Sequence, residues 1–323
     1  MSKNEPDFLD PRNHGQVDPF SRLWLRLEAV TKKIGIKRLT QLADRIISVA
    51  EPAGRTFMST IPNPIHEKDY RSMVVLSANL WHDWPRFRNI EKRLEFFAKL
   101  VEQERVDVIL LQEIARTRSL KVDEWLADRL NMSYVYSRAN GSDHVGFEEG
   151  LGVFSRFKMK RFPFVRQVSR LTNPFVRRLA LGVEVDTPYG EILAFSVHLG
   201  LLRKQNAHQL KDLQLWVSRL AEGRSIIIGG DFNVPEKSRQ MRRVRAYWQD
   251  TFREIQSKSP SHTHTLKWPW GGRLFRHRID YIFVQPGKPT WKVMSVDHLD
   301  APGGPHSDHC AVVARLAPVQ DHG

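Results

Sequence analysis

The pattern of apolar and polar positions divides the chain into a helical start and a longer region of mixed strands and helices. Residues 1–17 are polar and predict a disordered lead. Across 18–51, apolar residues recur at helical spacing after Asp18-Pro19, an expected N-cap followed by proline, and predict an amphipathic helical extension. Residues 52–70 hold three prolines and are interpreted as a linker.

Residues 71–317 have the pattern of a single large α/β domain. Helices are expected at 86–104, 204–221 and 238–248. Strands are expected at 73–79, 106–112, 151–155, 179–185, 191–198, 225–228, 279–284, 291–296 and 310–314. Some strands alternate with helices and others are joined as hairpins, as around 187–190. This mixture favours two packed sheets with helices outside over one parallel sheet.

Polar residues capable of chemistry lie near the ends of these buried strands: most end or follow a strand, Asp280 lies within one, and Asp308 and His309 precede the last. They are Asn79, Glu113, His198, Asp231, Asn233, Asp280, Asp308 and His309. Side chains at one rim of a sheet converge on a ligand. A single Asp or Asn after a strand is usually a turn or cap residue, so only the ordered set indicates a site.

Seven short motifs carry these residues along the chain. They are Ser77-Ala-Asn79, Leu111-Gln-Glu113, Glu149-Gly-Leu-Gly-Val-Phe-Ser-Arg156, Ser196-Val-His-Leu199, Gly230-Asp-Phe-Asn233, Arg278-Ile-Asp-Tyr-Ile-Phe283 and Ser307-Asp-His309. In this order they resemble the endonuclease/exonuclease/phosphatase superfamily of DNase I-like proteins over about residues 71–316. The resemblance implies a four-layer α/β/β/α sandwich and hydrolysis of phosphate esters.

The resemblance also implies a divalent metal. Glu113 would be its principal carboxylate ligand, with Asn79 and Asp308 nearby. Oxygen ligands suit Mg²⁺ or Mn²⁺, and the sequence has no Cys/His cluster with zinc spacing. A phosphodiester is anionic and repels hydroxide, so a metal is needed to neutralise a phosphate oxygen and support the leaving group.

The remaining motif residues would act on water and phosphate. By resemblance, Asp231 would orient or deprotonate the attacking water, Asn233 would hold a phosphate oxygen, and His198 would stabilise the transition state. His309, polarised by Asp280, is the second candidate for the base, and the sequence leaves this choice open.

Two carboxylate–histidine pairs are predicted to flank the site. Asp280 should hydrogen-bond His309 and fix its tautomer. Glu149 should approach His198, although Glu148 is adjacent and would point to the opposite face of an extended segment.

The subfamily is not identified by these motifs. Abasic-site endonucleases carry Trp-Arg before the position of Asp280, where this chain has His277-Arg278. The inositol phosphatase signature continues into Tyr-Arg, where this chain has Val234-Pro235. Secreted DNase I-like enzymes have disulfides, and Cys310 is the only cysteine here.

The charge of the chain points to a polyanionic partner. The formal net charge is +14, and two stretches concentrate it. Residues 156–178 hold eight basic and no acidic residues, and 237–278 hold eleven basic residues against Asp250 and Glu254. Such a field suits nucleic acid or an anionic lipid surface.

Two segments are expected to contact the substrate. The basic, aromatic segment before Asp280 should place Trp270, Arg273 and Arg276 at the substrate entrance. Arg86, in the loop after Asn79, is a further candidate for a phosphate contact.

Three functions remain open at this stage. Charge favours a nuclease, and the basic, amphipathic segment 18–51 favours a phospholipid-headgroup phosphodiesterase or phosphatase at a membrane surface. A non-catalytic phosphate-binding scaffold is the third. The single cysteine, the polar start and the lack of a long apolar run predict a cytoplasmic protein, with peripheral contact to an anionic membrane as the alternative. Oligomeric state is not predicted.

Overall fold

The computed structural model describes residues 55–61, 71–142, 146–160, 163–168, 177–267 and 273–319. The predicted lead at 1–17 and helical extension at 18–51 lie outside these residues. Part of the predicted linker is described, and there the interpretation is wrong. Strand β1 (Thr56–Ser59) pairs antiparallel with β4 (Ser133–Ser142) and forms the edge of a sheet.

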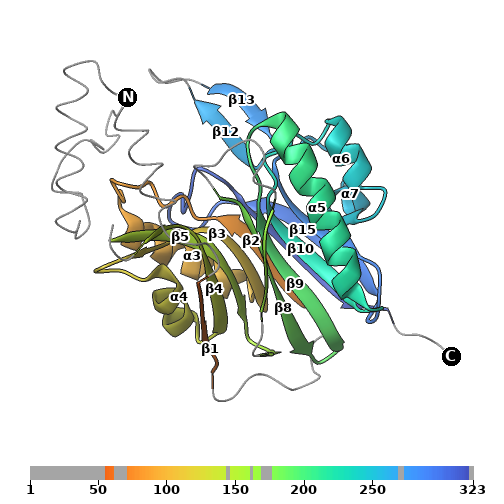
Figure 1. Ribbon diagram of the computed structural model, residues 1–323, viewed down its shortest axis with the longest axis horizontal. Coiled ribbons are helices and arrows are strands. Elements are labelled where there is room, and N and C mark those ends of the chain that lie inside the picture. Colours follow the sequence, from red (N-terminus) through yellow and green to blue (C-terminus); the bar gives the residue numbers. More distant parts are fainter. Residues whose placement is uncertain are drawn as a thin grey trace.

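The first sheet has seven strands in the order β1-β4-β5-β3-β2-β16-β15 (Figure 1). The remaining bounds are β2 (Met73–Asn79), β3 (Val108–Thr117), β5 (Phe147–Ser155), β15 (Trp291–Leu299) and β16 (Ala311–Pro318). Strands β2 and β3 run parallel, and the other neighbours are antiparallel.

The second sheet contains β11-β14-β10-β9-β8-β6, with β7 also paired to β8. Its bounds are β6 (Lys158–Met159), β7 (Phe164–Gln167), β8 (Leu179–Thr187), β9 (Gly190–His198), β10 (Ser225–Asp231), β11 (Gln249–Asp250) and β14 (Asp280–Gln285). A separate hairpin joins β12 (His264–Lys267) and β13 (Arg273–His277).

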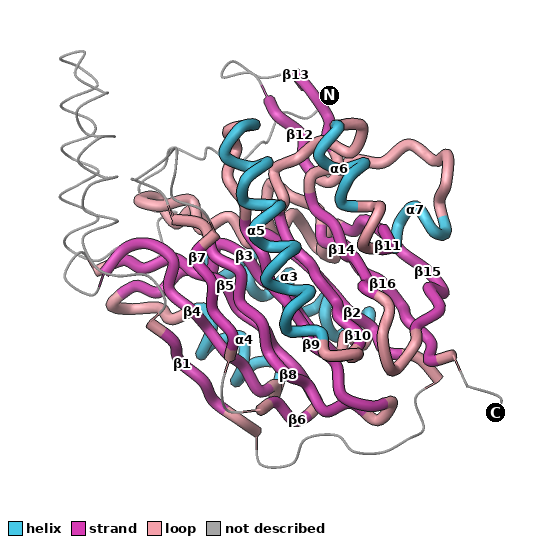
Figure 2. The backbone as a smooth tube through the Cα atoms, turned by 45° about the vertical axis from the view of Figure 1, so that its right-hand side comes forward, coloured by secondary structure: helices cyan, strands magenta, loops and turns pink. Residues whose placement is uncertain are grey.

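Helices cover the outer face of each sheet (Figure 2). The first sheet packs on α3 (Ile90–Glu104) and α4 (Val122–Leu130), through residues such as Phe97 and Leu126. The second packs on α5 (Arg203–Ala221) and the short α6 (Arg239–Val244), through residues such as Leu213 and Met241. A further short helix, α7 (Thr251–Ile255), follows β11.

The two sheets face each other across an apolar interior. Val75 and Leu110 of the first sheet belong to the same buried cluster as Ala194, Ile227 and Ile282 of the second. The chain thus forms helix, sheet, sheet and helix layers, which confirms the predicted α/β/β/α sandwich. Within the described residues, no helix is long and apolar enough to cross a membrane.

Candidate active site

Three of the predicted residues form a row across adjacent strands of the second sheet. In the parallel pairing of β9 and β10, His198 lies opposite Asp231. In the antiparallel pairing of β10 and β14, Asp231 lies opposite Asp280. Neighbouring strands are about 4.8 Å apart, so the sheet alone brings these three residues together. All three are buried.

The first sheet contributes Asn79 and Glu113 through a local irregularity. Asn79 ends β2 opposite Gln112, and the register of β3 shifts between Leu111 and Ile114. Glu113 lies in this bulge with a φ of 55°, in the left-handed region. Such a bulge re-aims a side chain, and here the Glu113 carboxylate accepts a 3.2 Å hydrogen bond from Asn79 Nδ2.

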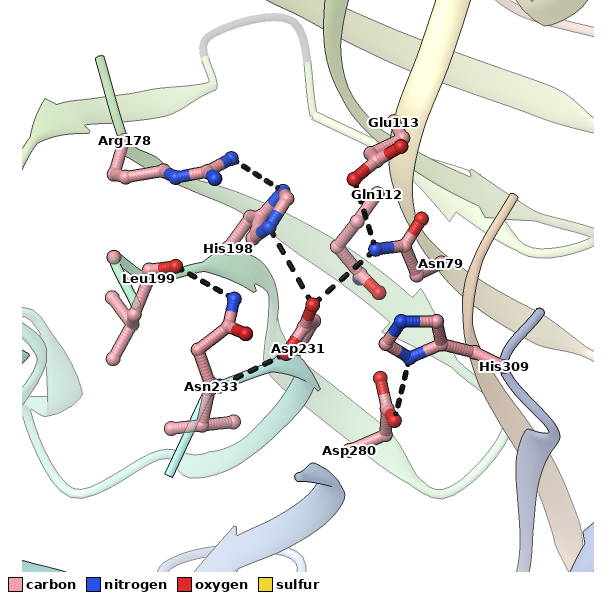
Figure 3. Close-up of polar contacts among 12 residues, drawn as sticks. Asn79, Gln112, Glu113, Arg178, His198, Leu199, Asp231, Asn233, Asp280 and His309 are labelled. Carbon is pink, nitrogen blue, oxygen red and sulfur yellow. Dashed lines mark hydrogen bonds and ion pairs between the residues drawn. The ribbon is translucent and has the colours of Figure 1, made fainter. Parts of the chain in front are cut away.

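The two sheets meet beneath the site through polar contacts and a glycine. Asn79 Nδ2 also donates to Asp231 Oδ2 at 3.3 Å (Figure 3), and Gln112 Nε2 donates to Ser196 Oγ at 3.0 Å. A Cβ at Gly229 would lie 2.7 Å from Leu110 Cδ1, so a larger residue there would separate the sheets. The catalytic rim therefore depends on close packing below it.

The predicted pair of Asp280 and His309 is confirmed. His309 Nδ1 lies 2.9 Å from Asp280 Oδ2, and both side chains are buried. A carboxylate can only accept, so Nδ1 carries the proton and Nε2 is the nitrogen left for the site. Burial alone would lower the pKa of His309, but the Asp280 carboxylate outweighs it and raises the pKa to about 10.

Asp231 lies at the centre of the site. Its Oδ1 accepts the Asn233 backbone N–H at 2.9 Å, while its Oδ2 faces Asn79 and His198. Asn233 has a φ of 52°, a conformation that asparagine tolerates, and its Nδ2 donates to Leu199 O at 2.9 Å. Burial, together with the neighbouring Asp280 charge, raises the pKa of Asp231 to about 7.

The predicted pair of Glu149 and His198 is wrong. His198 Nδ1 lies 3.0 Å from an Arg178 nitrogen, and because guanidinium only donates, this ring nitrogen is an acceptor. The proton of His198 is then on Nε2, which faces Asp231 Oδ2 at 3.5 Å (Figure 3). Burial, and then the Arg178 charge, hold the pKa of His198 well below its ordinary value.

Glu149 instead contacts His82 and Asn140. Its Oε2 lies 2.8 Å from His82 Nε2, and its Oε1 accepts from Asn140 Nδ2 at 2.7 Å. Asn140 Oδ1 in turn accepts the Arg177 backbone N–H at 2.8 Å, next to Arg178. Glu149 is thereby connected to the segment that holds His198, but it makes no hydrogen bond to that histidine. The bond from His82 lowers the pKa of Glu149, against the effect of burial.

His82 is presented by a strained loop between Leu80 and Asn89, where a helix had been predicted from residue 86. Four non-glycine residues of this loop have φ near 50°, namely Trp81, Asp83, Phe87 and Asn89. Aspartate and asparagine tolerate this conformation, but for Trp81 and Phe87 it costs about 1–3 kcal/mol each and persists only where the surroundings enforce it. Buried Arg93 does so by donating to Leu80 O at 2.9 Å and His306 O at 3.1 Å.

The donor set at Glu113 fits a hard cation better than zinc. Glu113 is a partly exposed carboxylate bonded to the Asn79 amide, and Asp308 lies beside His309, with Oδ1 4.0 Å from Nε2. His82, Glu113 and Glu149 also place three ligand atoms within 4.8 Å of one another. However, His82 Nδ1 accepts the Trp84 N–H at 2.9 Å, so the proton of its neutral ring is on Nε2. A histidine that binds a metal turns its unprotonated nitrogen to the metal and donates a hydrogen bond from the other nitrogen. His82 has the opposite arrangement, because its protonated Nε2 faces the two carboxylates.

The structure describes only some of the residues that were predicted to contact the substrate. Trp270 lies outside the described residues, Arg273 begins β13, and Arg276 is exposed on β13 opposite Thr265. The hairpin does start at the site, because the His264 ring lies 4.5 Å from the His309 ring. Arg86 is partly buried, and its backbone N–H donates to Asp83 O. Contact of these residues with a substrate stays a prediction.

Sequence reasoning missed His82, Asn140, Arg178 and His264. For Arg178 a signal was present, because this arginine immediately precedes the predicted strand at 179–185. That strand pairs antiparallel with β9, with Ala180 opposite Val197, so Arg178 lies beside the end of β9. The positions of His82, Asn140 and His264 depend on loop and hairpin conformations, which produce no periodic pattern of apolar residues in the sequence.

Most of the chain is similar to known proteins. The model of the Endonuclease/Exonuclease/phosphatase family matches residues 76–322. The uncharacterized protein YbhP of Escherichia coli is 26% identical over 215 residues, which span 59% of this chain and 80% of YbhP.

Solved structures share the fold. An endonuclease/exonuclease/phosphatase from Beutenbergia cavernae superposes with a TM-score of 0.61 at 20% identity, covering 77% of this chain and 72% of that one. A mannosyl-6-phosphatase from Bacteroides thetaiotaomicron has a TM-score of 0.57 at 18% identity, covering 76% of this chain and 100% of that one. At these identities the likeness concerns the fold alone.

Proposed function

The chain belongs to the endonuclease/exonuclease/phosphatase family, and we propose that it is a divalent-metal-dependent phosphoesterase that hydrolyses a phosphodiester by in-line attack of water. The observation that carries this proposal is the position of Asp231. Its carboxylate lies between Asn79 and His198 on one side and the Asp280–His309 pair on the other.

Mg²⁺ or Mn²⁺, held by Glu113 with Asn79 and Asp308, would neutralise a phosphate oxygen and support the leaving group. We assign Asp231 as the group that orients the water and accepts its proton, because Asn233 fixes one oxygen and leaves Oδ2 turned into the site. The sequence had left both Asp231 and His309 open as the base, and we propose Asp231. General-base assistance is worth about 10²–10⁴-fold in rate.

The other side chains would stabilise charge on the phosphate. His198 presents Nε2–H, because Arg178 occupies its other nitrogen. Asn233 has one amide N–H bound to Leu199 O and a second left for a phosphate oxygen. His309, oriented by Asp280, would donate from Nε2 when doubly protonated. Donors fixed before the reaction stabilise developing charge without reorganisation.

For the substrate, nucleic acid is the proposal that follows from charge, as a nuclease-type activity. That argument is weakened by ion pairs within the basic stretches. Arg245 and Arg278 contact Asp250, Arg253 contacts Glu236, and Lys160 lies 3.0 Å from Glu184. A paired cation contributes less to the field that attracts a polyanion.

A phospholipid-headgroup phosphodiester or phosphomonoester is the second candidate. It is favoured by two adjacent exposed leucines, Leu201 and Leu202, three and four residues after His198. The structural neighbours include a mannosyl-6-phosphatase, which supports a phosphomonoester as a candidate substrate. We expect peripheral contact with an anionic membrane in that case.

A hydrolysis panel tests the proposal. Purified protein is given bis-p-nitrophenyl phosphate, p-nitrophenyl phosphate, DNA, RNA and phospholipid vesicles, each with Mg²⁺, Mn²⁺ or EDTA. We expect metal-dependent release from the diester and from one natural class. If no ester is hydrolysed under any metal, the non-catalytic phosphate-binding scaffold takes its place.

A further inference from the structure

Two large apolar side chains stand in solvent at the rim of the candidate active site. Leu201 is 74% exposed and Leu202 is 54% exposed. They follow His198 in the turn between β9 and α5, and the next two residues, Arg203 and Lys204, are exposed as well. An exposed Leu-Leu pair next to two cations is an amphipathic tip.

The turn that carries these leucines is held firmly from below. Gly200 N–H donates to Gln209 Oε1 at 2.7 Å, and Asn206 Nδ2 donates to Gly200 O at 2.8 Å and to Phe232 O at 2.7 Å. Asn206 and Gln209 are buried. A Cβ at Gly200 would lie 2.6 Å from Gln205 Oε1, so a larger residue there would displace the end of this buried side chain. The leucines are therefore directed outward by a built turn.

The tip adjoins the catalytic residues. An open groove of about 370 Å³ is lined by Leu201, Arg203, Asn233, Pro235 and Arg239 among others. Asn233 belongs to the proposed phosphate site, so the groove connects that site to Leu201. Figures 1 and 2 show the β12–β13 hairpin projecting from the same end of the molecule as the start of α5. On that hairpin Phe275 is 55% exposed, beside exposed Arg276.

Basic residues outnumber acidic residues in the two segments that form the tip and the groove. The exposed cations are Arg203, Lys204, Lys237, Arg239, Arg242 and Arg243. No Asp or Glu occurs in 199–204 or 237–249. The adjacent Glu236 is engaged by Arg245, Arg253 and Arg278. Apolar insertion with a cationic surround is complementary to an anionic lipid surface.

We propose that this amphipathic tip inserts Leu201 and Leu202 into an anionic membrane surface and presents the active site to lipid phosphate esters. Nucleic acid fits less well, because contact with its phosphate backbone would leave both leucines in water, and single-strand binding relies on aromatic stacking. The lipid substrate rests on the proposed phosphoesterase function. The membrane contact does not.

Vesicle cosedimentation of the full chain tests the contact. The vesicles are phosphatidylcholine alone or an equal mixture with phosphatidylglycerol. The variants are Leu201→Ser/Leu202→Ser and, as matched control, Leu215→Ser, which changes a 52% exposed leucine of α5. We expect wild type and control to bind the anionic vesicles, and the double variant to bind at least about tenfold more weakly. Equal binding by the double variant overturns the proposal, as does a loss of DNA affinity without a loss of vesicle binding.

Wild-type protein separates this inference from the proposed function. Metal-dependent hydrolysis of bis-p-nitrophenyl phosphate without any vesicle binding would refute the membrane contact and leave the phosphoesterase intact. Vesicle binding without hydrolysis of any ester would refute the phosphoesterase and leave the membrane contact intact. Faster metal-dependent hydrolysis of vesicle lipid than of DNA supports both.

Discussion

Replacing Asp280 by asparagine should remove the group that orients His309 while preserving the shape of the site. Asp280 is buried opposite Asp231, and its Oδ2 accepts from His309 Nδ1 at 2.9 Å. Asparagine is nearly isosteric. If its NH₂ faces His309, Nδ1 must become an acceptor and the proton moves to Nε2. If its carbonyl faces His309, the tautomer is kept but the negative charge is lost.

The size of the effect follows from that charge. Burial lowers the pKa of His309, but Asp280, with smaller contributions from Asp231 and Asp308, raises it from 6.5 to about 10. In a serine-hydrolase triad the equivalent change lowers kcat by about 10⁴-fold through the wrong tautomer. We expect a loss of about 10³–10⁴-fold in kcat for Asp280→Asn, equal to about 4–5.5 kcal/mol of transition-state stabilisation. KM should change little, because binding of the ground-state phosphate does not depend on this proton.

The assay is hydrolysis of bis-p-nitrophenyl phosphate with saturating Mg²⁺ or Mn²⁺. Asp107→Asn is the control, since it changes another buried aspartate in the first sheet layer, away from the row at the rim. His309→Ala should cost at least about 10²-fold, and adding Asp280→Asn to it should cost little more, because the pair acts as a unit. A kcat for Asp280→Asn within tenfold of wild type, or fully additive losses, would refute this reasoning.

Three further changes probe the surroundings of the site. Arg178→Met should lower kcat about tenfold or more and leave the fold intact, because His198 Nδ1 loses its donor; a neutral effect on kcat argues against an oriented His198. Asp107→Asn should stabilise the protein by up to about 3 kcal/mol at pH 8 in urea unfolding, since one pKa unit corresponds to about 1.4 kcal/mol. Burial raises the pKa of Asp107 from 3.8 to about 6, so the ionised carboxylate destabilises the folded wild-type protein above pH 6. The variant lacks this carboxylate, and its advantage should disappear below pH 4, where Asp107 is protonated in both states. An equal difference in stability at both pH values would contradict this explanation. Neutralising Arg273 and Arg276 together should raise KM for a polyanionic substrate and flatten its salt dependence, with little effect on a small diester; unchanged KM and salt dependence would show that both arginines are remote from substrate.

The proximity of three candidate catalytic residues could be predicted because sheet register places them side by side. His198, Asp231 and Asp280 are in one row of three paired strands, so strand ends in the sequence translate directly into neighbours in space. The Asp280–His309 pair joins the second sheet to the residue that lies two positions before β16 of the first sheet, so it was predicted from the family resemblance and not from strand register. The partner of Glu149 could not be predicted, since His82 reaches it from a loop whose left-handed residues follow no periodic pattern.

Parts of the fold escaped prediction for a related reason. Strand β4 is buried along its length although its sequence is polar at several positions, because groups such as Arg138 and Glu148 neutralise each other at 2.8 Å. Helix α4 begins beside a buried pair of Arg116 and Asp123 at 2.9 Å. A polarity pattern cannot distinguish a paired buried charge from a solvated one. For the same reason, the sequence overestimated how much of the positive charge in the basic stretches is unpaired.

The most direct test of a metal-dependent phosphoesterase is diester hydrolysis by wild type, Glu113→Gln and Asp231→Asn under metal titration. We predict that EDTA stops the reaction and that Mg²⁺ or Mn²⁺ restores it. Glu113→Gln should require a higher metal concentration, and Asp231→Asn should lose at least about 10²-fold in kcat at saturating metal. Full activity of wild type in EDTA, or a kcat of Asp231→Asn equal to that of wild type, would contradict the account.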